Sequence, residues 1–554
     1  MCGILGILSL NDKISVTKKE FKQILNEFIY RGPDAQSIYE EDNLLFGHNR
    51  LEIQGNSNQP LFNEDKSLVL ICNGEIYNYD ELRKELEGKG HKFNSNSDNE
   101  VLVHLYEEEK LNFFNKVNGF FSFAIYDFNE KKLVLAKDNM GKKPLFYYFD
   151  KEKIIFSSFL RSINKILDKK GIINELVLRR YFEFGNIPSP FTIFKNIYKV
   201  RPGQHIIFDL DKKMKVSTKN HFKLSFENKK ISLTEAKEEL DQIFEKSINS
   251  RINTDKNLGL LASGGLDSTG ILYYIQKKIE KVNTYSVSFE NEDQKYLDIL
   301  NKNFNINSKI LDFNEEAFHK NLDSIKFMAE PVTDDEYIPL FLLSKKYMKD
   351  IRILLTGDGA DEIFAGYKYY ANFLGRKFFD FKEFKNKGVL MNKLNEYGPD
   401  SIFKYYNINT TPLRQAMFYD MKLYLSDFTL PVVDNATMAN SIETRSPFLD
   451  RRLIEYSSKL DENFLISHNS TKKLLRELFK NKIPKEILER KKKGFSIKLD
   501  NYNIPISYED ISDFFKENNL SKKTIDIILP YLKYNYGRYK FFILLKWLKY
   551  HNTF

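Results

Sequence analysis

The spacing of apolar residues changes near residue 210 and divides the chain into two parts. Before that point, short β-like runs alternate with turns rich in Gly, Asn and Asp, which predicts a sheet-dominated unit. We expect strands at residues 68–71, 120–126, 133–136, 145–148 and 154–157. The stretch 209–228 is polar and rich in Lys, which indicates a boundary, and we place the two domains at 2–212 and 230–554.

Beyond residue 230 apolar strands alternate with helices. Apolar residues recur at helical spacing from Thr234 onward, and a further helix is expected over 271–279. We expect strands at 258–262, 284–289, 310–313 and 351–356. Strand–helix alternation predicts a parallel, doubly wound sheet. The last part of the chain, roughly 150 residues, has the aromatic spacing typical of a helical core.

The amino-acid composition excludes several classes of protein. Of 554 residues, 42% are hydrophobic and 29% are charged, which excludes a disordered or fibrous chain. The net charge of +9 comes from Lys scattered among acidic neighbours, which favours a solvated surface over a nucleic-acid interface. No apolar run approaches a membrane span, and the N-terminus lacks the features of a signal peptide. Only Cys2 and Cys72 occur, so we expect no disulfide framework and a reducing, cytoplasmic location.

Cys2 combines two reactive groups once Met1 is removed. An unperturbed thiol has a pKa of ~8.5 and an α-amine one of ~7.7 to 8.0, so the amine can take the thiol proton. Asn73 and Gly74 follow an apolar run that ends with Cys72, where an amide and a backbone N–H can face one developing oxyanion. Cys72 itself is expected to be a small buried hydrophobe.

Two charged residues of the same half suit an amino-acid substrate. Arg50 offers a planar fork for a carboxylate, and Asp98 offers a counter-charge for an ammonium group. The sequence therefore predicts a thiol site that binds an α-amino acid.

Seven ordered motifs of the first half resemble the class II glutamine amidotransferases, whose nucleophile is N-terminal. They are Met-Cys-Gly-Ile at 1–4, Arg-Gly-Pro-Asp at 31–34, Gly-His-Asn-Arg-Leu at 47–51, Gln-Pro-Leu at 59–61, Asn-Gly-Glu-Ile-Tyr-Asn at 73–78, Ser-Asp at 97–98 and Gly-Lys-Lys-Pro-Leu at 141–145. The resemblance covers about residues 2–205 and implies an α+β domain of αββα layers. It also implies these roles: Cys2 as nucleophile, Asn73 and Gly74 as oxyanion hole, and Arg50, Glu75 and Asp98 as glutamine binders. Lys137-Asp138 and Phe159 depart from the family pattern, which usually has Arg-Asp and Glu there.

A second chemical element follows the apolar run 258–262. The sequence Ser-Gly-Gly-Leu-Asp-Ser at 263–268 leads directly into a helix, and its glycines let the backbone approach an anion while N–H groups and hydroxyls bind phosphate. Asp267 can bind the Mg²⁺ that bridges phosphates. After the strand at 351–356, the acidic run 356–367 contains Asp361, which can complete that metal site. The P-loop signature is absent, and the loop resembles that of enzymes that cleave ATP to AMP and pyrophosphate.

Residues 230–500 resemble the synthetase domain of asparagine synthetase. The resemblance rests on Glu-Pro at 330–331, Tyr-Ile-Pro at 337–339, Ser-Ile-Glu-Thr-Arg-Ser-Pro-Phe-Leu-Asp at 441–450 and the segment 490–495. It implies an α/β parallel-sheet, ATP-pyrophosphatase-like domain with a helical C-terminal region. It further implies that Lys492 neutralises the acyl-adenylate, that Asp267 and Asp361 bind Mg²⁺, and that ATP is bound by Leu261, Ser263, Gly264, Gly265, Asp267, Ser268, Val287 and Gly357.

Together the two resemblances imply glutamine- and ATP-dependent amidation of aspartate to asparagine through a β-aspartyl-AMP, with ammonia released at Cys2. Glu443 and Arg445, with the acidic run 334–336, are expected to recognise the α-groups of aspartate. A homodimer is left open by the sequence.

Alternatives remain from several classes. Asn435, Thr437 and Ser446 depart from the family pattern, so another carboxylate, for example a uronic acid of a surface polysaccharide, is the enzymatic alternative. The aromatic residues that begin near Tyr367 could stack on such a sugar. A nucleic-acid binder is disfavoured because no RNA-binding motif is visible, and an inactive scaffold because the nucleophile and loop residues are all present.

Overall fold

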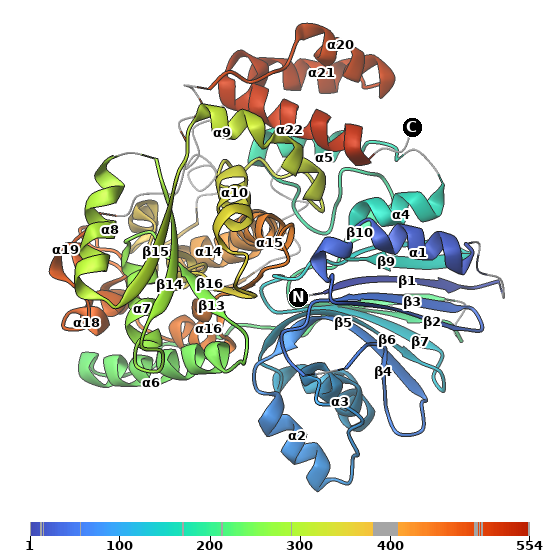
Figure 1. Cartoon of the computed structure of the whole chain (residues 1–554), viewed down its shortest axis with the longest axis horizontal. Helices are drawn as coiled ribbons and strands as arrows, with labels where there is room; N and C mark the ends of the chain where they lie inside the picture. The colour runs from blue at the N-terminus through green and yellow to red at the C-terminus, as the bar shows by residue number, and fades with distance from the viewer. Residues whose placement is uncertain are drawn as a thin grey trace.

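The computed structural model describes residues 2–11, 14, 16–55, 57–168, 171–211, 214–289, 291–379, 408–491, 497, 499 and 502–551. Within these ranges it contains two antiparallel sheets, one parallel sheet and helices that cover them (Figure 1). None of the described helices is both long and apolar enough to cross a bilayer.

The two antiparallel sheets come from the first part of the chain. The first has the strand order β10-β8-β9-β1-β3-β2, and the second β12-β11-β7-β6-β5-β4. The strands of the first sheet are β1 (Gly3–Ser9), β2 (Ala35–Glu41), β3 (Leu44–Arg50), β8 (Phe146–Phe149), β9 (Lys153–Ser157) and β10 (Ile197–Lys199). Those of the second are β4 (Leu61–Phe62), β5 (Leu68–Ile76), β6 (Gly119–Asp127), β7 (Lys132–Lys137), β11 (Gln204–Asp209) and β12 (Lys215–Asn220).

Alternating side chains of β1 and β5 create four layers. Ile4 and Leu8 of β1 join the apolar core between the two sheets, whereas Leu5 and Ile7 face the core under the helices on the outer side. The outer helices of the first sheet are α1 (Lys18–Asn26), α4 (Leu160–Leu167) and α5 (Glu175–Phe184). Those of the second sheet are α2 (Tyr79–Gly88) and α3 (Val101–Glu109). The expected αββα arrangement is therefore confirmed.

The position of Cys72 within β5 explains why its thiol is expected to be unreactive. Cys72 is fully buried and belongs to the core under α2 and α3. Burial raises the pKa of its thiol well above the ordinary value, so it stays a neutral apolar group.

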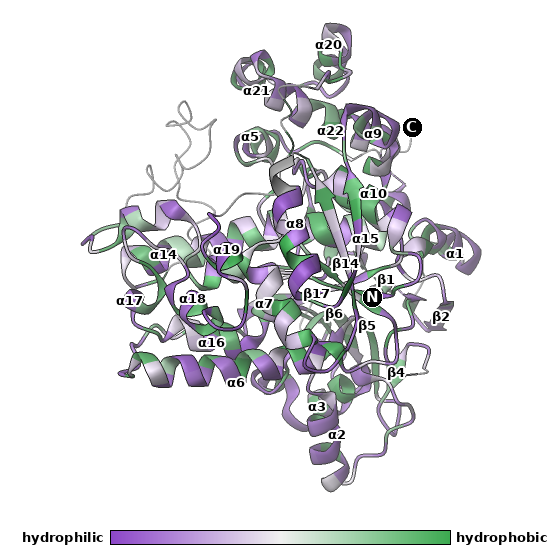
Figure 2. Ribbon diagram, turned by 60° about the vertical axis from the view of Figure 1, so that its left-hand side comes forward, coloured by the Kyte–Doolittle hydropathy of each residue, from purple (hydrophilic) through white to green (hydrophobic). Residues whose placement is uncertain are grey.

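The third sheet is parallel throughout, as the alternation of strands and helices predicted. Its order is β15-β14-β13-β16-β17, with every neighbouring pair parallel. The strands are β13 (Leu258–Leu261), β14 (Val282–Ser288), β15 (Ile306–Asp312), β16 (Ile353–Leu355) and β17 (Glu443–Arg445). Helices around it include α6 (Leu233–Ile252), α7 (Leu266–Ile275), α8 (Asn291–Asn303), α9 (Glu315–Lys320), α10 (Tyr337–Tyr347) and α11 (Ala360–Ile363). Figure 2 shows α10 mainly in hydrophobic colours in the interior, and α6 at the edge with hydrophilic stretches.

The C-terminal region is helical, as expected. It contains α14 (Pro412–Tyr419), α15 (Leu430–Met438), α16 (Arg451–Ser458), α17 (Glu462–Leu465), α18 (Lys473–Phe479), α19 (Lys485–Leu488), α20 (Tyr508–Glu517), α21 (Lys522–Ile528) and α22 (Asn535–His551). α22 packs on α5 of the first part: the Tyr181 hydroxyl donates to the Lys540 carbonyl at 2.9 Å, and the Lys540 ammonium donates to the Phe182 carbonyl at 2.7 Å. The last helices therefore tie the two parts together (Figure 1).

Some elements differ from the prediction. The Lys-rich stretch taken as a boundary carries β12, which is mostly exposed and pairs with β11 at the sheet edge, where Lys side chains can reach solvent. The helix expected over 271–279 begins earlier, at Leu266, directly after the phosphate-loop glycines. Three-residue β17 was not predicted as a strand, because three residues are too few to show a period of two.

Candidate active sites

Cys2 lies at the start of β1, beside the end of β5. Its backbone N–H donates to Asn73 Oδ1 at 3.0 Å, and both residues are buried. The Nδ2 group of Asn73 has no hydrogen-bond partner among the described residues. A buried amide without a partner is costly, so this N–H group is available as a donor for a substrate oxygen beside the thiol.

The other residues expected at the thiol site, apart from Asn73, line a cleft around Cys2. This cleft is lined by Cys2, Arg50, Gly74, Glu75 and Asp98, among others. Arg50 Nη2 donates to the carbonyl of Gly55 at 2.8 Å, which orients the guanidinium. Asp98 accepts a 2.7 Å hydrogen bond from the backbone of Ile76, and burial raises its pKa to about 7. The structure thus brings a cation and a carboxyl group to the same cleft as the thiol.

Glu75 has a second set of contacts that the sequence did not predict. Arg445 of β17 contacts it through Nη2, and Arg445 Nε lies 3.0 Å from Glu443 Oε1. Burial raises the pKa of Glu75 well above its ordinary value. Burial also acts to raise the pKa of Glu443, but nearby cations, Lys143 and Arg445 among them, outweigh it and hold the pKa well below the ordinary value.

This contact corrects one expectation. Glu443 and Arg445 were expected beside the acceptor substrate, but Arg445 is fully buried against Glu75, and Glu443 lines the Cys2 cleft. Neither lines the cavity of the phosphate loop in the part of the chain that the structure describes. A buried guanidinium requires carboxylate partners, and here the partners come from both parts of the chain.

Ser446, directly after β17, hydrogen-bonds both to the first part of the chain and to residues beside the phosphate-loop cavity. Its hydroxyl accepts a 2.7 Å hydrogen bond from Lys142 of the first part and lies 2.9 Å from Thr356 Oγ1 and 3.2 Å from Asp358 Oδ2. Burial lowers the pKa of Lys142 to about 8. The hydroxyl at this departure from the family pattern is therefore used in a contact between the parts.

Two other departures also have structural partners. Phe159 packs against the rings of Phe28 and His551, with centroids 5.9 and 5.3 Å away. Asn435 Oδ1 accepts a hydrogen bond from the backbone of Ala329 at 3.3 Å. Phe159 therefore belongs to the apolar core, and Asn435 fixes the backbone at Ala329.

The second cavity lies at the carboxyl ends of the parallel strands and has a volume of about 340 Å³, within the range of small-molecule sites. Its lining includes Leu261, Ser263, Gly265, Asp267, Ser268, Val287, Gly357 and Asp361. Gly264 is not in the lining. It has a φ of +66°, and a Cβ there would lie 2.8 Å from the Tyr296 side chain, so the turn requires glycine.

The loop is ordered by its own hydroxyls. The Ser263 backbone N–H donates to Ser268 Oγ at 3.3 Å, and α7 begins immediately after the glycines. N–H groups at this helix terminus are suited to bind an anion such as pyrophosphate. A Cβ on Gly357 would lie 3.3 Å from Cβ of Asp267, so the loop and the acidic run are in close contact.

Lys472 is the residue that the sequence analysis missed. Its Nζ lies 2.6 Å from Asp267 Oδ2 and 2.7 Å from Asp361 Oδ1, and the side chain is almost fully buried in the cavity wall. Burial lowers the pKa of Lys472, but the two carboxylates outweigh this effect and hold it above the ordinary value. A lysine among many scattered lysines gives no local signal. The predicted Lys492 lies outside the described residues.

Gly366 makes room for this lysine. A Cβ at Gly366 would lie 1.9 Å from Asp361 Oδ1 and 2.3 Å from Lys472 Cε. The glycine is therefore required by the ion pair and not by a turn.

The acidic run before α10 also reaches the cavity. Asp334 and Glu336 line it, as do the rings of Tyr367 and Tyr424. Burial raises the pKa of Asp334 to about 6. Burial, and then the neighbouring Asp334 charge, raise the pKa of Asp335 to about 8, and Asp335 accepts a hydrogen bond from the backbone of Ile497.

Each part of the chain matches a known protein family. Residues 1–221 match the model of the glutamine amidotransferase domain, and residues 239–523 match that of asparagine synthase. Asparagine synthetase [glutamine-hydrolyzing] 1 of Bacillus subtilis is 30% identical over 90% of this chain and 87% of that protein. Asparagine synthetase [glutamine-hydrolyzing] 3 of the same organism is 28% identical over 89% and 87%.

A solved glutamine phosphoribosylpyrophosphate amidotransferase of B. subtilis has 15% identity and a TM-score of 0.28 over 47% of this chain and 60% of its own. That likeness is too low to support an assignment, whereas the family models and the curated relatives extend across both sites. The chain belongs to the asparagine synthase family, with a glutamine amidotransferase domain ahead of the synthase domain.

Proposed function

We propose that this glutamine-hydrolysing ligase makes asparagine from aspartate, glutamine and ATP through a β-aspartyl-AMP intermediate. The observation that carries the proposal is the run from Glu443 to Ser446. Glu443 lines the Cys2 cleft, while Ser446 hydrogen-bonds to Asp358 in the lining of the phosphate-loop cavity. One short segment thus touches a thiol site and a nucleotide site, as expected if nitrogen released at one is used at the other.

The first half-reaction uses the Cys2 thiol. With its proton taken by the α-amine, the sulfur attacks the side-chain carbonyl carbon of glutamine. The C–N bond breaks, ammonia leaves and a γ-glutamyl thioester remains, which water hydrolyses to glutamate. Asn73 Nδ2 and the Gly74 backbone stabilise the oxyanion, and Arg50 and Asp98 hold the α-carboxylate and α-ammonium.

The second half-reaction uses the cavity at the parallel sheet. A β-carboxylate oxygen of aspartate attacks the α-phosphorus of ATP, and pyrophosphate leaves. Ammonia then attacks the acyl carbon and displaces AMP. The α7 N-terminus and the hydroxyls of Ser263 and Ser268 hold the pyrophosphate, and Lys472 supplies a fixed positive charge beside it.

Mg²⁺ fits this donor set. Asp267 and Asp361 both line the cavity and present carboxylate oxygens, the ligands that Mg²⁺ prefers, while Lys472 occupies the space between the two carboxylates. When bound, the ion neutralises charge on the departing pyrophosphate. The Lys472 ammonium, which contacts both carboxylates, would hold the two acids in place.

Aspartate is supported as the acceptor by charges in the same cavity. Asp334 and Glu336 provide anions for its ammonium group, and Arg476 and Arg490 provide cations for its α-carboxylate. A sugar acid needs no site for an ammonium group, so the carboxylates favour an amino acid.

Product mass spectrometry tests the proposal directly. The enzyme is incubated with glutamine, MgATP and either aspartate or one of a panel of carboxylates that includes uronic acids. We expect asparagine, AMP and pyrophosphate with aspartate. The Cys2→Ala variant should make the same products from ammonium salts but not from glutamine. Release of ADP and phosphate, or amidation of a uronic acid in preference to aspartate, would contradict the proposal.

A further inference from the structure

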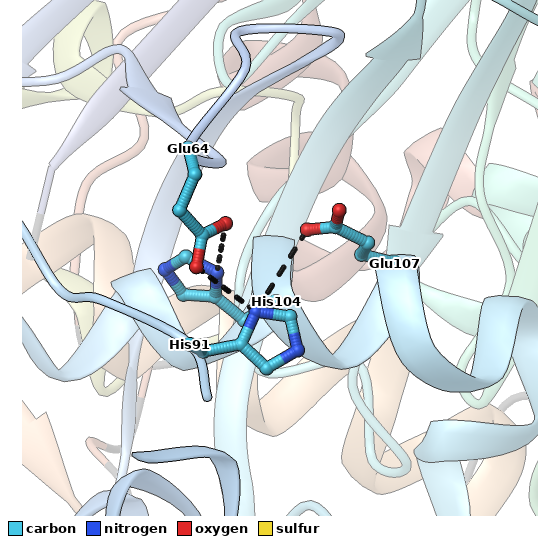
Figure 3. A group of neighbouring side chains, drawn as sticks. All are labelled: Glu64, His91, His104 and Glu107. Carbon is cyan, nitrogen blue, oxygen red and sulfur yellow. Dashed lines mark hydrogen bonds and ion pairs between the residues drawn. The ribbon is translucent and has the colours of Figure 1, made fainter. Parts of the chain in front are cut away.

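A second cluster of polar side chains lies on the outer layer of the glutamine amidotransferase domain, away from the Cys2 cleft. It consists of Glu64 in the β4–β5 loop, His91 after α2, and His104 and Glu107 on α3. Each offers one ligand atom, and these four atoms lie within 4.8 Å of one another. Figure 3 shows the Glu64 carboxylate reaching both imidazoles and the Glu107 carboxylate reaching His91.

The distances are close to the edges of a coordination tetrahedron, and one ligand atom from each of the four residues lies within 4.8 Å of the others. Glu64 Oε1 is 3.1 Å from His91 Nδ1, Glu64 Oε2 is 3.4 Å from His104 Nδ1, and Glu107 Oε2 is 3.9 Å from His91 Nδ1. Ligands about 2.0 to 2.2 Å from a tetrahedral Zn²⁺ are separated by about 3.3 to 3.6 Å. Small rotations of exposed carboxylates are enough to close the difference.

His104 is an independent indication of a ligand. The side chain is fully buried, and neither ring nitrogen has a hydrogen-bond partner among the described residues. Its ring packs on Phe93, with centroids 4.5 Å apart. A buried imidazole without hydrogen bonds is unfavourable, and a metal ion at Nδ1 would satisfy it.

The outer contacts also suit metal-bound imidazoles. His91 Nε2, on the far side of the ring from the cluster, lies 3.2 Å from Glu108 Oε1. His104 Nε2 lies 3.8 Å from Glu100 Oε1, and Glu100 in turn accepts hydrogen bonds from Asn94 and Ser95. Glu108 can receive the second ring N–H of His91, which favours the tautomer whose Nδ1 can coordinate, and Glu100 places a carboxylate near His104 Nε2.

We propose that Glu64, His91, His104 and Glu107 bind one Zn²⁺ ion as a structural site. Two imidazole nitrogens and two carboxylate oxygens suit Zn²⁺, whereas Mg²⁺ and Ca²⁺ prefer oxygen ligands alone. The ion joins the β4–β5 loop, the residue after α2 and the helix α3. Because α3 follows directly on the short 3-10 helix Asp98–Glu100, the site steadies the segment that carries the Asp98 carboxyl into the Cys2 cleft.

Metal binding to the full chain tests the site. All proteins carry Cys2→Ala, since a thiolate would also bind Zn²⁺. After treatment with a chelator, they are titrated with Zn²⁺ in competition with a chromophoric chelator. We expect the parent to bind one equivalent of Zn²⁺. The His91→Gln and Glu107→Gln variants should bind Zn²⁺ at least 100-fold more weakly, and His319→Gln should bind it with the affinity of the parent. His319 is a matched control, because it forms a 3.4 Å pair with Glu315 on α9 and belongs to no such cluster in the part of the chain that the structure describes.

Two further readouts do not depend on affinity. Co²⁺ in the parent should give the intense visible absorption of a tetrahedral site, which His91→Gln should lose. Zn²⁺ should raise the thermal midpoint of the parent but not that of His91→Gln. The proposal is overturned if less than half an equivalent binds at micromolar concentration, or if His91→Gln and Glu107→Gln bind like the parent. His104 is left intact because its burial makes folding of a variant uncertain.

Discussion

Asn73→Asp separates the two hydrogen-bonding roles of a single side chain. The substitution preserves the shape and the oxygen that accepts the 3.0 Å hydrogen bond from the Cys2 backbone, but it replaces the unpartnered NH₂ group with a second oxygen. Cys2 therefore stays in place while the donor to the substrate oxyanion is lost.

Loss of one oxyanion donor costs about 10²- to 10³-fold in kcat, or about 2.7 to 4 kcal/mol. The position is fully buried, so the introduced carboxyl will resist ionisation and have a raised pKa. Its protonated form carries an O–H donor. We therefore expect the loss of glutaminase activity to be larger above that pKa and smaller as the pH falls below it.

Glutamate release is measured between pH 6 and 9, alongside AMP release with ammonium salts in place of glutamine. Ammonia-dependent AMP release should be unchanged. Asn164→Asp is the matched control, because Asn164 is also buried with an unpartnered Nδ2 among the described residues but lies on α4, whereas Asn73 accepts the hydrogen bond from Cys2. Glutaminase activity of Asn73→Asp within about threefold of the parent at every pH would refute the reasoning behind the expected loss.

Three further predictions concern both sites. Asp267→Asn removes a charge that faces Lys472, so AMP and pyrophosphate formation should fall by at least about 100-fold while glutamate release survives. An equal loss of both activities would contradict the assignment of the two half-reactions to separate sites. Gly366→Ala forces a Cβ into the Asp361–Lys472 pair and should weaken ATP binding by about tenfold or more in a calorimetric titration. The control Gly88→Ala should leave ATP binding unchanged, because its Cβ would meet nothing within 4 Å. The raised Asp98 pKa of about 7 predicts that kcat/KM for glutamine falls as the pH drops below 7, because the protonated carboxyl no longer attracts the α-ammonium. If Asp98→Asn shows the same pH dependence of kcat/KM, protonation of Asp98 is not the cause of the fall.

Local patterns were sufficient to predict several of the strands and helices and the two candidate site loops, but not the strands β1, β2 and β3. β5 and β6 have continuous apolar runs, and the phosphate loop has fixed glycines and hydroxyls next to a strand, so both are visible in a short window of sequence. Contacts between distant segments were not predictable in this way. Lys472 is 205 residues from Asp267, and Arg445 is 370 residues from Glu75.

The charged residues around 443–445 show why such errors arise. Glu443 and Arg445 were assigned to aspartate because its α-groups need a fixed anion and a fixed cation, and the two residues lie in a stretch that resembles the synthetase domain. Folding instead brings a second buried carboxyl, that of Glu75, against the guanidinium, so these groups satisfy one another. Composition cannot distinguish these two uses of an ion pair.

The buried contact of Arg445 with Glu75 limits how freely the two domains can be recombined. Removing one partner of a buried ion pair costs up to about 3 to 5 kcal/mol, and without the Glu75 carboxyl Arg445 would have Glu443 as its one remaining carboxylate partner among the described residues. A second buried pair, Arg31 with Asp434 at 2.8 Å, imposes the same condition at another point of the junction. A chimera that joins the amidotransferase domain of a relative to this synthase domain must therefore supply a carboxyl group at the first position and a guanidinium at the second, so the halves are exchangeable only as matched pairs.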